Sequence, residues 1–363
     1  MLFHGFEEVV KDYSFNSLKP SCKSGLDIIR IDGEKNLVAS FGWSGSMLTK
    51  NFQLFNLKTN ETSLLKTTGE IPSPRYAHIQ FKYKNKIYLF FGFNITSYFD
   101  SGYVLDLETM KWRALEVGPS RRHSASYVIY DDYLYIFGGR VNISKTRTND
   151  VWRFDLEDEI WEEIECKGSV NKNLDLENKK KINNYVNESF LPCKRSSHVS
   201  SLIGDQMFMG FGVDENDKSL NDFWSFNLNT HMWVPLEVYG DIPSPRTSPS
   251  CIEIGSHIFI NGGTLENPSS SNGFRVYYDD NFCFDFWKRE WSRAKFISGP
   301  TTITPRTSHN ITKDGNDIYI FSGESSTKPG QYRFLSDLQK LTVVNDIRYD
   351  MYNFITRNTK EEN

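Results

Sequence analysis

The fold is decided by a stretch that begins Tyr133-Leu134-Tyr135-Ile136-Phe137-Gly138-Gly139, continues as Asn149-Asp150-Val151-Trp152-Arg153-Phe154-Asp155 and ends at Trp161. Short runs of aromatic and β-branched residues that end in glycine or in polar turn residues predict β-strands. A second copy runs Met207-Phe208-Met209-Gly210-Phe211-Gly212, then Asn221-Asp222-Phe223-Trp224-Ser225-Phe226-Asn227, then Trp233. The chain therefore contains an internal repeat whose unit is a small sheet, and such a repeat determines the whole fold.

Six copies of the repeat can be located from the last glycine of the apolar run. This glycine falls at Gly42, Gly92, Gly139, Gly212, Gly263 and Gly323. The residue 17 positions earlier is an arginine in five copies, at Arg75, Arg122, Arg195, Arg246 and Arg306. In the first copy this position is Gly25, so we expect that copy to lack its arginine. An apolar residue and a tryptophan stand seven positions apart in four copies, at Leu105 and Trp112, Phe154 and Trp161, Phe226 and Trp233, and Phe284 and Trp291.

These features resemble the kelch repeat, whose period is about 50 residues. The glycine pair, the Asn-Asp-Val-Trp-x-Phe-Asp string and the opening Pro-Arg-x-x-His (residues 74–78 and 305–309) carry the resemblance, which covers roughly residues 20–345. It implies an all-β fold, a six-bladed kelch-type β-propeller whose blades are four-stranded antiparallel sheets. In the second unit we expect the strands, lettered a to d from the channel outward, near residues 78–84, 86–91, 102–107 and 111–116.

The chain is expected to form a single propeller over residues 1–345. The sixth unit has Arg348 where the spacing predicts its tryptophan, whereas Phe6-Glu7-Glu8-Val9 resembles Trp161-Glu162-Glu163-Ile164. We therefore expect residues 5–12 to supply strand d of the last blade, and residues 345–355 are the alternative. Residues 169–190 are polar and predict a flexible inserted loop, and residues 346–363 form a C-terminal tail.

The composition of the chain limits the kinds of molecule that we expect it to bind. Aromatic residues make up 15% of the 363 residues and supply many large side chains for a β core. The formal net charge of -4 gives no basic field, so we expect neither nucleic acid nor a membrane as a partner. Five scattered cysteines without a CxxC pair predict neither a disulfide framework nor a zinc site. The sequence shows no signal peptide and no apolar run of spanning length, so we expect a cytoplasmic protein, with the nucleus as a further location.

The connections that vary in length fall on one face of the expected propeller. In a meander of four strands the b–c loops and the d–a connections share a face, and the long connections at residues 168–191, 264–280 and 324–334 belong to these two classes. Loops held on a rigid scaffold commonly carry binding residues. We therefore expect a protein-protein interaction scaffold that binds a partner peptide or protein through the b–c/d–a face.

The kelch resemblance also implies which residues line this face, because in peptide-binding kelch propellers the repeat arginine and the next residue line the pocket. Carried over, the partner-binding candidates are Arg75, Tyr76, Arg122, His123, Arg195, Ser196, Arg246, Thr247, Arg306 and Thr307. A ring of arginines would suit an acidic or phosphorylated segment of a partner. The alternative is that each arginine only hydrogen-bonds carbonyl groups of neighbouring loops. In the third unit, a hairpin two residues longer would put Ser120 at the arginine place and His123 at the histidine place, and which of Arg121 and Arg122 faces the channel is then open.

The sequence offers no recognisable catalytic or metal-binding constellation. His78, His198 and His309 share one repeat position, which favours a structural role. The Glu-x3-Asp-x3-His string through which plant kelch specifier proteins hold iron does not occur. We therefore expect a non-enzyme with no cofactor and no metal. The alternatives are a propeller enzyme or small-ligand binder with a site in the channel, and an architectural or adaptor subunit of a polarity, signalling or ubiquitin-ligase complex.

Overall fold

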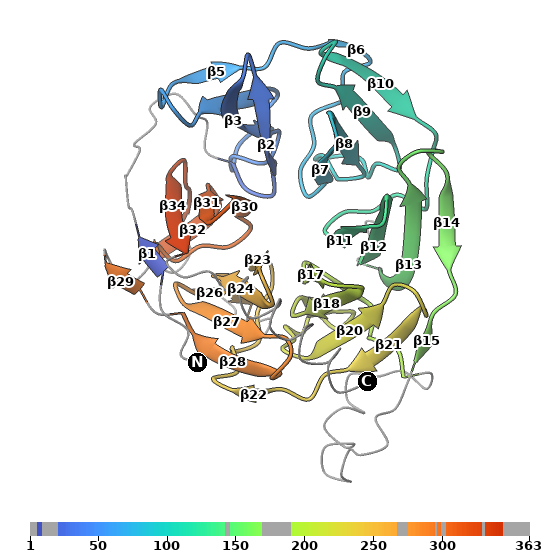
Figure 1. Cartoon of the computed structure of the whole chain (residues 1–363), viewed down its shortest axis with the longest axis vertical. Helices are drawn as coiled ribbons and strands as arrows, with labels where there is room; N and C mark the ends of the chain where they lie inside the picture. The colour runs from blue at the N-terminus through green and yellow to red at the C-terminus, as the bar shows by residue number, and fades with distance from the viewer. Residues whose placement is uncertain are drawn as a thin grey trace, which may run out of the picture.

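The computed structural model describes residues 6–8, 21–141, 146–168, 190–266, 275–294, 296–298, 303–328 and 331–343. The main sheets stand in a ring about a central opening (Figure 1). Every regular element in these ranges is a β-strand. Within the same ranges there is no helix long and apolar enough to cross a membrane. The expected all-β, six-bladed propeller is confirmed.

Each blade is an antiparallel meander of four strands, lettered a to d from the channel outward. Blade 1 is β2 (Gly25–Ile31), β3 (Glu34–Ser40), β4 (Phe52–Asn56) and β5 (Thr62–Leu64). Blade 2 is β7 (Ile79–Tyr83), β8 (Lys86–Phe90), β9 (Gly102–Asp106) and β10 (Lys111–Leu115). Blade 3 is β11 (Ser126–Tyr130), β12 (Tyr133–Arg140), β13 (Arg147–Asp155) and β14 (Trp161–Ile164). The strands of blade 2 agree with the expected ranges to within one residue at each end.

The remaining blades follow the same order. Blade 4 is β17 (Val199–Ile203), β18 (Gln206–Gly210), β20 (Phe223–Asn227) and β21 (Met232–Pro235). Blade 5 is β23 (Ser250–Ile254), β24 (His257–Asn261), β27 (Asn281–Asp285) and β28 (Glu290–Arg293). Blade 6 is β30 (Asn310–Asp314), β31 (Asp317–Phe321), β34 (Leu338–Val343) and, from the other end of the chain, β1 (Phe6–Glu8).

Short extra strands lie in the connections between and within blades. In the d–a connections, β6 (Thr68–Gly69), β15 (Lys167–Gly168), β22 (Tyr239–Gly240) and β29 (Phe296–Ser298) pair in parallel with the outermost strand of the following blade. The b–c connections of blades 5 and 6 form hairpins, β25 (Thr264–Glu266) with β26 (Arg275–Tyr277) and β32 (Glu324–Lys328) with β33 (Gln331–Phe334). In blade 4, β16 (Arg195–Ser196) pairs with β19 (Val213–Asp214). The b–c hairpins project from one face of the ring.

The core consists of six apolar clusters, one at each seam between adjacent blades. At the seam of blades 1 and 2, Trp112 of β10 packs with Val38 and Leu54 of the preceding blade, and it is 1% exposed. Trp161, Trp233 and Trp291 join the next three seams in the same way. Burying one such indole contributes about 5 kcal/mol as an upper bound. The repeated tryptophans therefore bind the blades into one ring.

The seam between blades 6 and 1 differs from these four. The residue seven positions after Phe55 is Thr62, so blade 1 brings no tryptophan to the cluster, which holds Tyr319 and Phe321 of blade 6. A cavity of about 10 Å³ remains there, bounded on the blade 1 side by Leu37 and Ala39. A cavity of this size holds one water molecule at most. Packing at the closing seam is therefore incomplete.

A closed circle of backbone hydrogen bonds, which we call the collar, surrounds the channel at the start of the innermost strands. Six residues with positive φ, one from each blade, each donate a backbone N–H to the carbonyl of the equivalent residue in the preceding blade: Lys23, Ala77, Ser124, Ser197, Ser248 and Ser308. The N···O distances lie between 2.7 and 3.0 Å. Left-handed backbone is unfavourable for residues with a Cβ, so these bonds hold each blade start in a conformation it would not otherwise adopt.

Blade 1 lacks the repeat arginine, as expected, but Gly25 does not stand at the arginine position. Cys22 forms a β-bridge with Trp43, 21 positions later, whereas Tyr76 bridges Phe93, 17 positions later. The a–b hairpin of blade 1 is therefore four residues longer than that of blade 2, and counting back from Gly42 falls short. Ser21 occupies the arginine position, because its carbonyl accepts the N–H of Gly323 from the preceding blade at 3.1 Å.

The N-terminal strand β1 pairs antiparallel with β34 and parallel with β29. In the register, Glu8 stands opposite Leu341, where the other blades have their tryptophan; the resemblance of Phe6 to Trp161 is offset by two positions. Residues 5 and 9–12 of the expected closing strand lie outside the described residues. The same holds for residues 169–189 of the expected inserted loop and for the tail at residues 346–363.

Deleting residues 1–15 should lower the melting temperature by roughly 5 °C or more, because β29 loses its hydrogen-bonded partner and β34 loses one of its two. Thermal unfolding followed by circular dichroism measures the change. A variant that lacks residues 346–363 is the control and should melt like the full chain. If both deletions leave the melting curve unchanged, the N-terminal strand does not stabilise the ring.

Candidate functional site

The five repeat arginines are buried inside their blades. Each guanidinium is 0% exposed. In all five, Nε donates to the carbonyl two residues earlier and Nη1 donates to the carbonyl 16 residues later, at the end of strand b. The arginine therefore fastens the start of strand a to the end of strand b in its own blade.

Four of the five arginines also pair with an aspartate next to the start of strand c. The pairs are Arg122 with Asp150, Arg195 with Asp222, Arg246 with Asp280, and Arg306 with Asp337, each through two hydrogen bonds. Burial disfavours the charge of Arg195, but Asp222 outweighs it and raises the arginine pKa above its ordinary value. A buried guanidinium with two bonds to a carboxylate is neutralised and satisfied within the blade.

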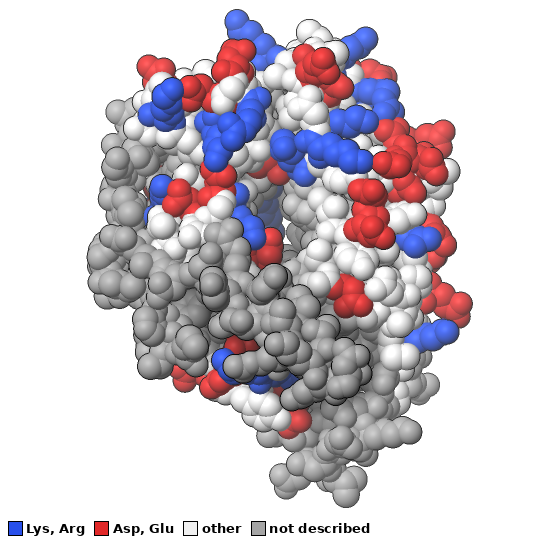
Figure 2. Space-filling model, viewed as in Figure 1, with Lys and Arg blue, Asp and Glu red and all other residues white. Residues whose placement is uncertain are grey.

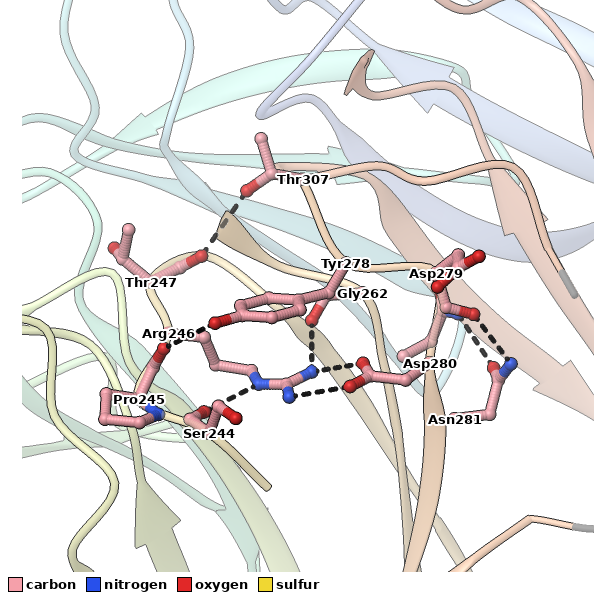
Figure 3. Close-up of polar contacts among 11 residues, drawn as sticks. Ser244, Pro245, Arg246, Thr247, Gly262, Tyr278, Asp279, Asp280, Asn281 and Thr307 are labelled. Atoms are coloured by element: carbon pink, nitrogen blue, oxygen red, sulfur yellow. Dashed lines mark hydrogen bonds and ion pairs between the residues drawn. The ribbon is translucent and has the colours of Figure 1, made fainter. Parts of the chain in front are cut away.

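Figure 3 shows the arrangement around Arg246. Its Nε donates to Ser244 O at 3.0 Å, its Nη1 donates to Gly262 O at 2.9 Å, and the Asp280 carboxylate faces the guanidinium. The ring of Tyr278 covers one side of the guanidinium, with 4.2 Å from Cζ to the ring centroid. No part of this side chain is left for a partner.

The expected use of these arginines as a docking ring therefore needs correction: with no exposed surface, none of the five guanidinium groups can contact a partner in this structure. The alternative of hydrogen bonds to neighbouring carbonyl groups matches the geometry. The acidic groups that such a ring was expected to attract are supplied by the chain itself. Replacing Arg195 or Arg246 by Glu would place a second carboxylate next to the buried aspartate. Such a change would unfold the blade and would therefore say nothing about binding.

Arg75 lacks the carboxylate that the other four have. Ser101 takes that position and accepts from Nη1 at 3.2 Å, while Nη2 has no hydrogen-bond partner among the described residues. The ring of Phe99 lies 4.0 Å from Cζ. Burial without a carboxylate lowers the pKa of Arg75 to about 10. Blade 2 therefore holds a cation that is incompletely compensated.

Replacing Ser101→Asp should stabilise the protein, because it supplies the missing carboxylate to Arg75. We expect a gain of about 1–3 kcal/mol, the range for hydrogen bonds to charged groups. Conversely, Asp222→Ala should cost about 3–5 kcal/mol, because it leaves Arg195 buried and unpaired. Chemical denaturation measures both. Arg121→Ala, at an exposed position, is the control and should change little; a destabilising Ser101→Asp would contradict the assignment.

The residues that follow the arginines line the mouth of the channel, where each forms a β-bridge or strand pair with the residue after the repeat glycine. Ser196, Thr247 and Thr307 are buried, at 3%, 5% and 2% exposure. Tyr76 and His123 are half-buried. Of the ten expected binding residues, only these two keep appreciable exposed surface.

The ambiguity in the third unit is resolved by the hydrogen bonds. Arg122 takes the repeat position, because it pairs with Asp150 and with Gly138 O. Arg121 is exposed and lies 3.8 Å from Asp100. His123 therefore corresponds to Tyr76, and Ala125 stands where other blades have their histidine.

An aromatic row crosses this face from blade 1 to blade 3. Trp43 and Tyr76 have ring centroids 6.0 Å apart, and Tyr76 contacts Phe93 at 5.2 Å. Phe93 and Tyr98 both contact the His123 imidazole, at 5.5 and 5.1 Å. Edge and tilted contacts of this kind hold the rings in place, so the row is a preformed surface.

A groove of about 800 Å³ opens at one end of the row, between blades 5, 6 and 1. Its lining is Trp43, Gly45, Arg275, Glu324, Gln331, Tyr332 and Phe334. Arg275 pairs with Glu324 at 3.2 Å, and Tyr277 also donates to Glu324. The ionic groups of the groove therefore satisfy one another, and its other side chains are three aromatic rings and the polar Gln331.

Two cations, Lys23 and Arg140, stand beside this row. Arg140 exchanges two backbone hydrogen bonds with His123, at 3.0 and 2.9 Å, and the carbonyl of Lys23 accepts the N–H of Ala77 in the collar. Burial, helped by the charges of Lys23, Arg140 and Arg147, lowers the pKa of His123 to about 3. Arg147 pairs with Asp217 at 2.6 Å. Lys23 and Arg140 have no carboxylate partner among the described residues, and Nε of Arg140 is buried without a hydrogen-bond acceptor there. We call Lys23 and Arg140 the cation pair.

Exposed apolar side chains also lie on the b–c connections. Met47, Ile95, Val276 and Tyr332, from blades 1, 2, 5 and 6, are 38–65% exposed. On the opposite face, the c–d turns carry Ile160 and Trp287, at 64% and 49%. That face carries both signs of charge: Lys84 pairs with Glu157, and Arg113 with Glu159, across the boundary of blades 2 and 3.

Figure 2 shows the overall distribution of charge on one side of the ring. Lys and Arg are prominent over the blades of β2–β5 and β7–β10, and Asp and Glu beside the blade of β11–β14. Neither sign covers the whole of the described surface in this view. Charge is therefore local on this protein, which agrees with a formal net charge of only -4.

The channel forms a second cavity, of about 570 Å³, bounded by the innermost strands of all six blades. Two of its ionic contacts are internal to the chain: Asp27 accepts from Gln80 at 2.7 Å, and Lys313 lies 2.7 Å from Glu253. Across the described ranges, no three His, Cys, Asp or Glu side chains come together in a way that could hold a metal ion.

The histidines of the repeat are buried and neutral. Burial, and then the neighbouring Arg75 or Arg195, lowers the pKa of His78 and of His198 to about 3. Burial and Arg306 lower the pKa of His309 well below its ordinary value. These side chains pack against the repeat glycine; a Cβ at Gly212 would stand 2.7 Å from Cβ of His198.

Stability should fall as the pH drops from about 6.5 toward 3. In that window the unfolded chain binds protons at these histidines and the folded chain does not, so each lowers the free energy of unfolding by up to about 1.4 kcal/mol per pH unit. Asp27, whose pKa burial raises to about 6, acts in the opposite sense as a single group. Urea denaturation between pH 7 and pH 5 measures the slope, and His198→Gln should reduce it. A flat profile would contradict neutral burial.

Sequence reasoning missed the groove and the cation pair. Lys23 and Arg140 stand at repeat positions whose residue type differs from blade to blade, and Tyr332 and Phe334 lie in the long b–c connection of blade 6. The signal that could have corrected the arginine assignment was present in the string Asn149-Asp150-Val151-Trp152, because its aspartate recurs before strand c in the blades that pair.

Comparison with known proteins agrees with this architecture. N-(sulfonatooxy)prop-2-enimidothioate sulfolyase of Thlaspi arvense is 29% identical over 137 residues, 37% of this chain and 37% of that protein. Host cell factor of Drosophila melanogaster is 25% identical over 350 residues, 88% of this chain and 21% of that protein. Kelch domain-containing protein 3 of Rattus norvegicus is 24% identical over 250 residues, 64% of this chain and 60% of that protein. Each match spans less than two thirds of the relative.

The family comparison covers most of the propeller. The profile of the KLHDC2/KLHL20/DRC7 Kelch-repeats domain matches twice, over residues 33–174 and 172–323. These ranges include all strands of blades 1 to 5 except β2, the five buried arginines, the four seam tryptophans and the first two strands of blade 6. The chain therefore belongs to the KLHDC2/KLHL20/DRC7 Kelch-repeats domain family.

Proposed function

We propose that this kelch propeller is a protein-binding scaffold that holds an acidic or phosphorylated segment of a partner protein on its b–c/d–a face. The observation that carries the proposal is the cation pair, Lys23 and Arg140, which lies at the channel mouth without a carboxylate partner in the described residues. Unpaired cations beside a fixed aromatic surface attract carboxylate or phosphate groups.

The same face supplies apolar contact area. Met47, Ile95, Val276 and Tyr332 are exposed on connections that surround the row of rings. Interfaces are enriched in Tyr, Trp, Phe, Met and Arg, and this face combines all five types. Among the ten residues expected from the repeat, Tyr76 and His123 stay candidates for contact with the partner, and the buried arginines position them.

The proposal includes no catalysis by this chain. The sulfolyase of Thlaspi arvense aligns with 37% of the chain, and the Glu-x3-Asp-x3-His string does not occur in the sequence. All five cysteines are free thiols, so the proposal sets the interaction in a reducing compartment, the cytoplasm or the nucleus.

Lys23→Glu combined with Arg140→Glu should weaken partner binding at least about tenfold, because the partner's anionic group then meets like charge. Affinity purification with quantitative mass spectrometry, comparing wild type and variant, measures the loss. The matched control is Lys84→Glu combined with Arg113→Glu, two charge reversals on the opposite face, which should retain the partners. The idea fails if the same proteins are recovered in equal amounts with both variants.

A further inference from the structure

We propose that the groove between blades 5, 6 and 1 binds an aromatic or large aliphatic side chain of the same partner segment, next to its anionic group. The inference rests on the proposed function and adds an anchor pocket to it. The partner is a protein segment that combines an apolar anchor with a carboxylate or phosphate within a few residues.

The composition of the groove favours an apolar occupant. Its charged groups are engaged with each other, since Glu324 is paired with Arg275 and accepts from Tyr277. The guanidinium of Arg275 also lies 5.6 Å from the ring centroid of Tyr332. Trp43, Tyr332 and Phe334 line the groove beside the polar Gln331, and burying an apolar side chain against these aromatic rings is favourable without any further ion pair.

The walls of the groove are held rigidly. Gly45 approaches Phe334 so closely that a Cβ on it would stand 2.3 Å from the phenyl ring. Trp43 is fixed by two backbone hydrogen bonds to Cys22, at 2.9 and 3.0 Å. A pocket that is already formed loses little side-chain entropy when it is filled, so a single anchor can contribute strongly.

Lys23, one member of the cation pair, lies next to the groove in the chain. Cys22 bridges Trp43, a wall of the groove, and the next residue in the chain is Lys23. Directly opposed residues in antiparallel strands have Cα atoms roughly 5 Å apart, and an extended peptide advances about 3.3 Å per residue. An anchor in the groove and an anion at Lys23 therefore belong to the same segment, separated by one to three residues.

The test uses the full chain and a phage-displayed library of random 12-residue peptides. We expect the enriched peptides to carry Trp, Phe, Tyr, Leu or Met with Asp or Glu within three positions. The best peptide is then made synthetically, and its affinity is measured by fluorescence anisotropy. Tyr332→Ser should weaken it at least about tenfold, as truncation at an interface hot spot does.

A double-mutant cycle assigns the pocket. If the anchor enters the groove, replacing the anchor by Ala should weaken binding to the wild type but add little to the loss already caused by Tyr332→Ser. Trp287→Ser, an exposed aromatic on the c–d face, is the control and should leave the affinity unchanged. Additive losses from the anchor and from Tyr332 would overturn the pocket assignment.

The outcomes separate the two proposals. If the peptides tolerate Tyr332→Ser but lose affinity with Lys23→Glu, the proposed function stands and the anchor pocket is wrong. If they tolerate both changes and lose affinity with Trp287→Ser, the proposed function itself is wrong. Light scattering would detect self-association of the chain. If self-association occurs and disappears with Tyr332→Ser, a second copy of the chain fills the groove, and the proposal that a partner segment binds there is wrong.

Discussion

Five guanidinium groups buried beside the channel constrain most of the structure around them. A buried cation needs every N–H group and its charge compensated, and in four blades this requires an aspartate close to the start of strand c and a carbonyl at the end of strand b. The backbone carbonyl of the same arginine accepts the N–H of the repeat glycine from the preceding blade, as Gly212 does with Arg246 at 2.9 Å. One residue thus connects three strand ends of its own blade and also the neighbouring blade. In these five blades the residue two positions after the arginine belongs to the collar and has left-handed backbone.

The sequence was sufficient for the parts of the molecule that recur. The seven-residue step from Phe226 to Trp233 places an indole at each seam that has one, and the glycine spacing gives the number of blades. The burial and pairing of the arginines could not be predicted from the repeat spacing, because the aspartate that neutralises an arginine lies 27 to 34 positions later in the chain. The error at Gly25 has a similar origin: a longer hairpin changes the count without changing the geometry.

The candidate site shows the opposite pattern. On the b–c face, most side chains that recur from blade to blade are buried and bonded within the blades. The side chains that a partner could contact, such as Lys23, Arg140 and Tyr332, are of a type found at that position in one blade only. A repeat must keep whatever makes its units pack, so its shared positions have little freedom to vary with a ligand. Residues outside the motif are free of that requirement and can differ from blade to blade. Periodicity therefore predicts the scaffold well and predicts the docking surface poorly.

Because the seam between blades 6 and 1 is poorly filled, binding of a ligand in the groove and closure of the ring are linked. The groove is bounded by Trp43 from blade 1 and by Phe334 from blade 6, so it straddles a junction whose core cluster lacks an indole and which retains a cavity. A ligand that contacts both of these walls would hold blades 6 and 1 together. By mass action, its binding free energy adds to the closure of the ring, and amide protons along β2 and β30 would then exchange with solvent more slowly.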